Sequence, residues 1–176
     1  MNLYLIGYRC TGKTTLGQAL AVKMGWSFVD MDDAIVAAEG RSIAHIVAQF
    51  GWDCFRRREK AMLKEISLKK QVVVGTGGGV VLDAENVQQM RASGKVVWLR
   101  AAAKTIRCLI EEDARTADLR PSLTGAALAD EIEETLTQRE PLYRAAMDFA
   151  VDTDRFDVEK LCNEIIGQLK AKGVAL

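Results

Sequence analysis

Two patterns of hydrophobic and polar positions alternate along the chain. Short apolar runs, which are typical of strands, occur at residues 2–6, 26–30, 71–75, 95–99 and 149–153. The runs at 71–75 and 95–99 show no polar alternation, which indicates parallel strands covered on both faces. Between the runs, apolar residues recur every three or four positions, as they do in helices.

The helical spacing predicts how the strands are joined. Residues 113–125 are polar, carry Pro121 and Gly125, and have too weak a periodicity for a firm helix. We therefore expect a mobile loop there. The expected helices cover residues 13–24, 31–39, 42–51, 54–70, 83–93, 101–112, 129–146 and 158–172.

Five strands that alternate with helices predict an α/β fold. We expect a doubly wound three-layer sandwich around a five-stranded parallel sheet. The length of 176 residues fits one domain with one continuous core, so a single domain should span residues 1–176. Ligands of such sheets bind beyond the carboxyl ends of the strands, where candidate chemistry should be found.

The charge of the chain is balanced. Lys plus Arg and Asp plus Glu number 24 each, so no net field would attract nucleic acid or a membrane surface. The longest apolar runs are broken by glycine and fall short of the roughly 18 residues that a membrane-spanning helix needs. We expect a soluble protein that binds neither nucleic acid nor membranes. The neutral charge and the lack of a coiled-coil pattern favour a monomer.

Cysteine and histidine usage argues against zinc sites, histidine-based metal chemistry and thiol redox chemistry. Cys10, Cys54, Cys108 and Cys162 lie far apart, without the CxxC spacing of zinc or redox sites, and no signal-peptide segment precedes them. We interpret them as reduced thiols of a cytoplasmic protein. His45 is the single histidine and lies in a helical pattern, so we expect it at a helix surface or core edge rather than in catalysis.

A phosphate-binding loop follows the first strand. Residues 7–14, GYRCTGKT, match the pattern GxxxxGK[ST] in full and precede a predicted helix, whose amino terminus adds positive potential. Lys13 would reach the β- and γ-phosphates, and the Thr14 hydroxyl would enter a Mg²⁺ shell. ATP is the implied ligand and GTP the second choice; the alternative is a turn with a chance Lys–Thr pair. The expected nucleotide contacts are Gly7, Cys10, Thr11, Gly12, Lys13, Thr14 and Thr15.

Cys10 is the unusual residue of this loop, because many related loops carry glycine at its position. Either the position tolerates a non-glycine conformation or the loop is slightly strained. A thiol near Lys13 and a helix amino terminus could be reactive, whereas a small packed side chain is the simpler interpretation.

Two carboxylates follow the second strand. Asp30 closes the strand and Asp32 comes two residues later, which places both at the carboxyl edge of the sheet. One carboxylate could hold Mg²⁺, and the other could accept a hydroxyl proton from a substrate. The alternative is that they cap the next helix, where Asp is favoured. Both interpretations can hold at once.

Glycines and arginines point to an anionic acceptor. Four glycines, Gly75 and Gly77 to Gly79, follow the third strand and favour a close approach of the backbone to a ligand over a simple turn. Arginine presents a rigid fork that suits carboxylate or phosphate, although a single arginine is more often a solvated surface charge. Arginines beside aromatic or proline residues are Arg56, Arg120 and Arg139.

Together these residues resemble the shikimate kinase family along nearly the whole chain. The phosphate loop alone is shared by many families, whereas its combination with Asp-x-Asp, the glycine triplet, Arg-Pro and Arg-x-Pro-Leu-Tyr is specific. The resemblance implies a P-loop fold with a mobile lid and transfer of the ATP γ-phosphoryl group to the 3-hydroxyl of shikimate, with Mg²⁺, in chorismate biosynthesis. The matching pieces are residues 7–21, 28–35, 40–59, 75–82, 119–125 and 139–153 and a terminal helix.

The resemblance also implies roles for the residues around shikimate. Asp32 would bind the substrate hydroxyls and act as base, while Arg56 and Arg139 would clamp the carboxylate. A shikimate-binding segment would cover about residues 31–60, and Gly77, Gly78 and Gly79 would line the pocket.

For the nucleotide, the resemblance implies that Lys13 contacts the phosphates and that Thr14 and Asp30 serve Mg²⁺. Arg120, in a lid over about residues 112–125, would stabilise the transferring phosphoryl group. Arg107 and residues 153–155, including Arg155, would flank adenine. Two rival functions stay open: a kinase for another small hydroxy acid such as gluconate, and a catalytically inactive nucleotide-binding regulatory protein.

Overall fold

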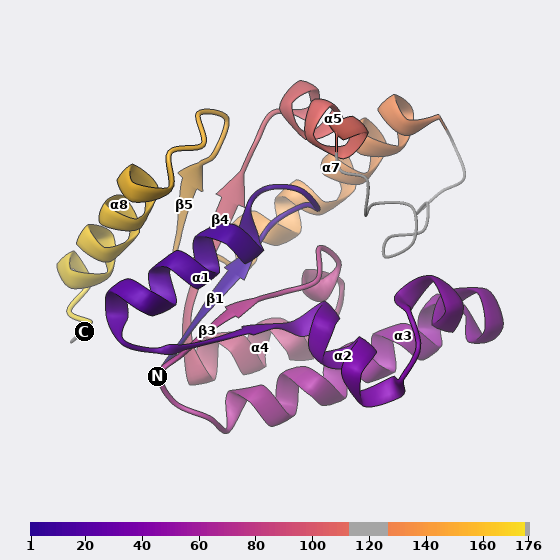
Figure 1. The fold of residues 1–176 in the computed structure, drawn as a ribbon, viewed down its shortest axis with the longest axis horizontal. Coiled ribbons are helices and arrows are strands. Elements are labelled where there is room, and N and C mark those ends of the chain that lie inside the picture. The colour runs from indigo at the N-terminus through magenta and orange to yellow at the C-terminus, as the bar shows by residue number, and fades with distance from the viewer. Residues whose placement is uncertain (113–126, 175–176) are drawn as a thin grey trace.

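The computed structural model describes residues 1–112 and 127–174, which form one five-stranded sheet (Figure 1). All neighbouring strands are parallel, in the order β2-β3-β1-β4-β5. The predicted parallel α/β sheet is therefore confirmed. The predicted loop over residues 113–125 and Arg120 lie outside the described residues. The strands are β1 (Asn2–Ile6), β2 (Ser27–Asp30), β3 (Val72–Gly75), β4 (Gly94–Arg100) and β5 (Phe149–Asp152).

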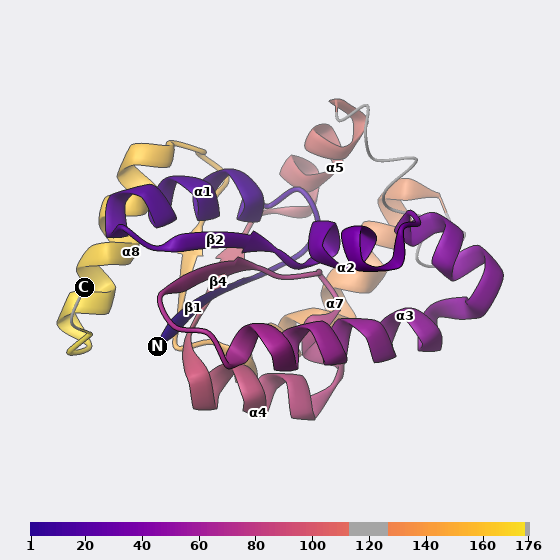
Figure 2. The same cartoon turned by 60° about the horizontal axis from the view of Figure 1, so that its bottom comes forward.

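Helices cover both faces of the sheet and make three layers (Figure 2). Residues of α1 and α8 pack on one face, in an apolar cluster with Leu3, Val73 and Val97. Residues of α3, α4 and α7 pack on the other face. The helices are α1 (Lys13–Met24), α2 (Met31–Glu39), α3 (Ile43–Ser67), α4 (Ala84–Ser93), α5 (Ala103–Glu112), α7 (Leu128–Ala146) and α8 (Val158–Ala171), with a short 3₁₀ helix, η1 (Val80–Leu82).

Side-chain caps explain where four of these helices begin. Asp30, Ser42, Asp83 and Asp157 each precede a helix and accept a hydrogen bond from a backbone N–H of its first turn. Such caps satisfy amide groups that have no partner within the helix. These four polar residues therefore set the start of α2, α3, α4 and α8.

The boundaries agree with the sequence pattern to within a few residues. The two helices expected at 42–51 and 54–70 join into α3, but Gly51 has φ 78° and ψ 168°, which is not helical. The expected break at this glycine is therefore confirmed as a kink inside one element. His45 lies exposed on the first half of α3 and hydrogen-bonds Gln49 Oε1 at 3.1 Å, as expected for a helix surface.

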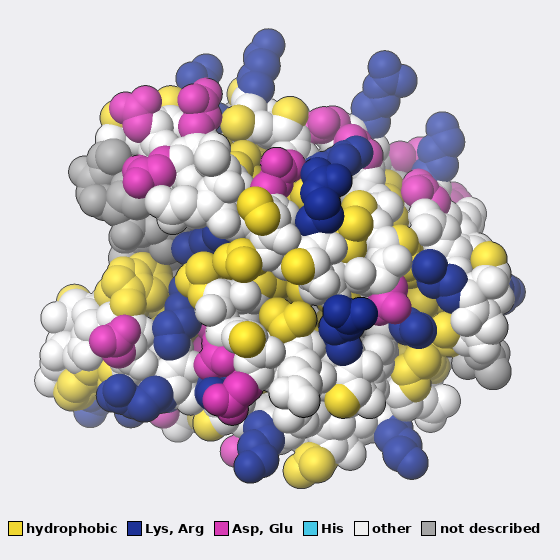
Figure 3. All heavy atoms as spheres, turned by 180° about the vertical axis from the view of Figure 1, so that it is seen from behind, with side chains coloured by type: hydrophobic (Ala, Val, Ile, Leu, Met, Phe, Trp, Pro, Cys, Tyr) yellow, Lys and Arg dark blue, Asp and Glu magenta, His cyan; other side chains and the backbone are white. Residues whose placement is uncertain are grey.

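No helix in the described part of the chain is long and apolar enough to cross a membrane. On the face seen in Figure 3, basic and acidic side chains lie among one another rather than in separate patches. Among the described residues, which include all four cysteines, no disulfide is formed.

Candidate active site

A cavity of about 380 Å³ lies beyond the carboxyl ends of β1, β2 and β3. The phosphate loop forms one side of it, and the other sides are formed by residues of α2, α3, α5 and α7 and of the segments that follow β3 and β5. Segments that are far apart in the sequence meet here, because the parallel strands all end at the same edge. The predicted site residues that line it are Cys10, Thr11, Gly12, Lys13, Thr14, Thr15, Asp30, Asp32, Arg56, Gly77, Gly78, Gly79 and Arg139.

The phosphate loop is held by its own side chains. Lys13 Nζ donates to the carbonyl oxygens of Gly7 at 2.9 Å and Tyr8 at 2.6 Å, and Thr11 Oγ1 donates to Tyr8 at 2.8 Å. The lysine ammonium therefore lies within the curve of the loop, next to the start of α1. An ammonium group and a helix amino terminus together favour a phosphate at this point.

Cys10 adopts a left-handed backbone conformation, with φ 61°. For a residue other than glycine this costs about 1–2 kcal/mol. Its half-buried side chain packs against an apolar cluster that contains Tyr8, Ile106 and Ile132. This contact favours the interpretation of Cys10 as a packed side chain, and it also explains how the strained conformation is tolerated.

Asp30 connects the phosphate loop to α2. Its Oδ2 accepts a hydrogen bond from Thr14 Oγ1 at 2.7 Å, and its Oδ1 accepts one from the Asp32 amide at 3.0 Å. Asp30 therefore caps α2, as one interpretation expected, and it also lines the cavity, so a role at Mg²⁺ stays a prediction. Hydroxyl and carboxylate oxygens are the ligands that Mg²⁺ takes together with water and phosphate, and Thr14 and Asp30 fit such a site.

The glycine loop after β3 lies against the charged side chains of the cavity. A Cβ atom on Gly79 would overlap the Arg56 guanidinium, and one on Gly77 would lie 2.5 Å from Glu59 Oε1 and 3.1 Å from Asp32 Oδ1. No side chain can replace hydrogen at these two positions without displacing a charged group. The glycine loop therefore lies in close contact with protein side chains, and the close approach to a ligand stays a prediction.

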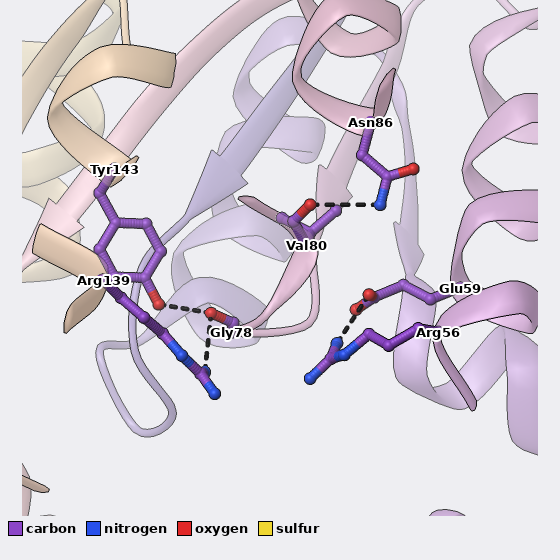
Figure 4. Close-up of polar contacts among 7 residues, drawn as sticks. All are labelled: Arg56, Glu59, Gly78, Val80, Asn86, Arg139 and Tyr143. Atoms are coloured by element: carbon purple, nitrogen blue, oxygen red, sulfur yellow. Dashed lines mark hydrogen bonds and ion pairs between the residues drawn. The ribbon is translucent and has the colours of Figure 1, made fainter. Parts of the chain in front are cut away.

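Two arginines face each other across the cavity (Figure 4). Arg56 comes from α3, donates to Glu59 Oε2 at 2.7 Å, and has its guanidinium carbon 5.4 Å from the centre of the Trp52 ring. Arg139 comes from α7 and donates to the Gly78 carbonyl oxygen at 3.1 Å. The two guanidinium groups thus have fixed supports and point into a shared space, which suits an anionic group.

Tyr143 supports Arg139 one turn further along α7. Its hydroxyl donates to the same Gly78 carbonyl oxygen at 2.5 Å. Burial raises the pKa of Tyr143 to about 12, and the nearby Arg139 only partly opposes that rise. The phenol therefore stays protonated at neutral pH and remains a hydrogen-bond donor.

Glu59 is a site residue that the sequence patterns did not reveal. It is fully buried, lines the cavity, and leaves Oε1 without a hydrogen-bond partner among the described residues. Burial raises the pKa of Glu59, and the adjacent Arg56 opposes that rise. Its spacing of three residues from Arg56 on a predicted helix was the one available signal.

Arg107 and Arg155, expected beside adenine, do not line the cavity. Both are exposed, and Arg107 Nε lies 3.8 Å from Glu111 Oε1. Leu109 and Phe156 line that side instead, together with the expected Thr153. Gly7 does not line the cavity but accepts the Lys13 hydrogen bond. Arg120 and the expected lid lie outside the described residues, apart from Glu112.

Comparison with known proteins decides the family. The model of the shikimate kinase family matches residues 9–170. The chain belongs to the shikimate kinase family. A shikimate kinase from Rhodopirellula baltica is 41% identical over 165 residues, which cover 94% of this chain and 88% of that protein. One from Nitratidesulfovibrio vulgaris is 40% identical over 153 residues and covers 87% of each chain.

A solved structure of a shikimate kinase family member agrees with this assignment. The shikimate kinase from Acinetobacter baumannii, in complex with shikimate, superposes with a TM-score of 0.90 at 29% identity, over 99% of this chain and 95% of that one. The family resemblance and the P-loop kinase fold expected from the sequence are therefore confirmed. The chain is an ATP-dependent kinase of this family.

Proposed function

We propose that this protein transfers the γ-phosphoryl group of ATP to the 3-hydroxyl of shikimate, giving shikimate 3-phosphate and ADP in chorismate and aromatic amino acid biosynthesis. One observation carries the proposal: Arg56 and Arg139 point into the same cavity as Asp32 and the phosphate loop. A small hydroxy acid bound to both arginines would have its hydroxyls near a carboxylate and its acceptor oxygen near the phosphates.

In this proposal the protein binds shikimate through its carboxylate and through its ring hydroxyls. Arg56 and Arg139 bind the carboxylate, and Asp32 binds the ring hydroxyls, while Gly77, Gly78 and Gly79 form the adjoining wall. The arginine forks can donate two hydrogen bonds each to a carboxylate. The binding segment over about residues 31–60 supplies Asp32, Arg56 and the supporting Glu59.

During transfer, the shikimate 3-oxygen forms a bond to the γ-phosphorus as the bond from that phosphorus to the bridging oxygen of ADP breaks. Asp32 accepts the hydroxyl proton, and Lys13 stabilises charge on the phosphates. Thr14 and Asp30 would hold Mg²⁺, and a bound Mg²⁺ would supply neutralisation of the phosphate charge. Arg120, which lies outside the described residues, stabilises the transferring phosphoryl group in this proposal.

The nucleotide base binds between apolar side chains. Leu109 from α5 and Phe156 from the β5–α8 connection line the cavity beside the phosphate loop. Aromatic and aliphatic surfaces favour the flat face of a base, so Phe156 takes the role that the sequence assigned to Arg155. We also propose that the protein acts as a monomer in the cytoplasm.

A coupled assay of ADP release tests the function. Purified protein with Mg-ATP should release ADP rapidly only when shikimate is added. Faster ADP release with gluconate or a nucleoside monophosphate would contradict the acceptor assignment. If no acceptor increased ADP release while ATP still bound, the inactive regulatory alternative would hold.

Exchange of Asp32 for asparagine tests the catalytic base. Asp32→Asn keeps the shape of the side chain but cannot accept the proton. We expect kcat to fall by about 10²- to 10⁴-fold, while the affinity for ATP, measured by calorimetry, stays near that of the wild type. An unchanged kcat would show that another group takes the proton.

A further inference from the structure

One helix contacts both loops of the active site. In the first turn of α7, Glu131 Oε1 forms an ion pair with Arg9 Nη2 of the phosphate loop. Two and three turns later, Arg139 and Tyr143 donate hydrogen bonds to the Gly78 carbonyl oxygen of the glycine loop. Spacings of eight and four residues place these three side chains along one side of the helix.

The Arg9–Glu131 pair is buried. The side chains of Arg9 and Glu131 are 11% and 2% exposed. Next to Glu131 along α7, Ile132 packs in an apolar cluster with Tyr8 and Ile106. A buried ion pair is weak evidence for stability, because apolar residues of similar volume often replace one without loss. What such a pair does provide is a defined position for both partners, here the phosphate loop and α7.

The two loops supported by α7 also touch each other. A Cβ atom built on Gly78 would lie 3.4 Å from the Gly7 carbonyl oxygen and 3.6 Å from the Arg9 amide nitrogen. Arg9 is therefore at the junction of the loop for the phosphates and the loop that lines the acceptor pocket. A shift of Arg9 would change the distance between the two bound substrates.

We propose that Glu131 is a positioning residue, which acts through Arg9 to hold the phosphate loop in register with the acceptor pocket. This inference rests on the proposed function, since it concerns alignment of ATP with shikimate. Phosphoryl transfer depends mainly on such alignment. Loss of the ion pair should therefore slow the reaction of bound substrates more than it weakens the binding of either one.

The test is the kinetics of Glu131→Gln, which keeps Arg9 but removes the charge that holds it. A misplacement of about 1 Å can cost roughly 100-fold in rate. We expect kcat to fall by about 10- to 100-fold, while the KM values for ATP and shikimate change by less than about threefold. A kcat within about twofold of the wild type would overturn the proposal.

The double variant Arg9→Met/Glu131→Leu separates positioning from folding. It removes both buried charges and should recover the thermal stability that Glu131→Gln loses by leaving Arg9 buried without its partner charge. Its kcat should nevertheless stay at least about tenfold below the wild type, because the phosphate loop is no longer held. A stable double variant with wild-type kcat would show that the pair serves folding only.

Lys95→Gln is the matched control. Lys95 pairs with Asp148 at 3.1 Å near the amino end of β4, and it does not line the active-site cavity. Its kcat should equal that of the wild type; a similar loss there would contradict a specific role for Glu131. The coupled assay of ADP release by the wild type tests the proposed function separately. If the wild type showed no shikimate-dependent turnover in that assay, the proposed function would be wrong, whatever the Glu131 variants showed.

Discussion

The two arginines of the site are suited to bind an anion because neighbouring groups fix their side chains. Arg56 is fixed by Glu59 and the Trp52 ring, and Arg139 is fixed by the Gly78 carbonyl oxygen. An arginine held in place loses less side-chain freedom when it binds a ligand. The two supported guanidinium groups are therefore better anion receptors than the exposed arginines of the same helices, Arg57 on α3 and Arg144 on α7.

Arg139→Ala should weaken shikimate binding. A hydrogen bond to a charged group is worth about 1.5–3 kcal/mol, so we expect the KM for shikimate to rise by about 10- to 100-fold while the KM for ATP stays similar. Arg144→Ala is the control, because Arg144 is an exposed residue on the same helix that does not line the active-site cavity. An unchanged shikimate KM in Arg139→Ala would exclude the carboxylate role.

Glu59 should make stability depend on pH. Burial raises the pKa of Glu59 above its ordinary value of 4.5, so the folded chain takes up this proton at higher pH than the unfolded chain. As the pH falls from the raised pKa toward 4.5, the wild type should therefore gain stability relative to Glu59→Gln. Melting temperatures of both proteins across this range measure the difference. Parallel curves would show that the pKa is not raised.

Whole elements bring these residues together. α3 supplies Arg56 and Glu59, α7 supplies Arg139 and Tyr143, and the loop after β3 lies between the two helices (Figure 4). The glycine loop can occupy this place only because it has no side chains at the points of contact. Changes within the loop should therefore act on the arginines.

Gly79→Ala tests the contact between the glycine loop and α3. The added methyl group overlaps the Arg56 guanidinium and must displace it, so we expect the shikimate KM to rise by at least about tenfold, as for loss of a charged hydrogen bond. Gly167→Ala, on α8, is the control, because a Cβ there meets nothing within 4 Å. That change should stabilise the protein by about 0.5–1 kcal/mol. Equal shikimate KM values in both variants would contradict the contact.

Phe156→Ala tests the connection between β5 and α8. The Phe156 ring lies over Gly12 and lines the cavity, and stacking of a base on an aromatic ring is worth about 1–3 kcal/mol. The KM for ATP should rise by about 5- to 100-fold without a change in the KM for shikimate. Phe50→Ala is the control, since the exposed fraction of Phe50 is 47% against 43% for Phe156, but Phe50 does not line the active-site cavity. Equal ATP KM values in both variants would contradict base stacking.

At the scale of the whole molecule, the large exposed hydrophobic side chains of the described residues are scattered over several elements. Val22, Phe50, Leu82 and Leu142 come from α1, α3, η1 and α7. Scattered apolar residues do not make an association surface. This distribution supports the proposal that the protein works as a monomer.

Light scattering after size-exclusion chromatography measures the oligomeric state directly. We expect a mass near the 19.4 kDa of one chain, independent of protein concentration. A mass that doubled with concentration would show a dimer and would contradict the proposal.

The sequence by itself determined the strands, the helices, the phosphate loop and the family. These features depend on local spacing: apolar periodicity marks each element, and the residues of GYRCTGKT are near one another in the chain. The break at Gly51 and the caps at Asp30 and Ser42 are local in the same sense. Such patterns can be recognised before any contact between distant segments is known.

Only the tertiary structure decided which charged residues support the site. Arg9 and Glu131 are 122 positions apart, and Arg139 and Gly78 are 61 apart. No local pattern records such pairs, because they form when parallel strands bring their carboxyl ends to one edge and α7 packs beside them. For the same reason Leu109 and Phe156, rather than Arg107 and Arg155, line the cavity. Side-chain direction depends on this packing, and residue type alone does not reveal it.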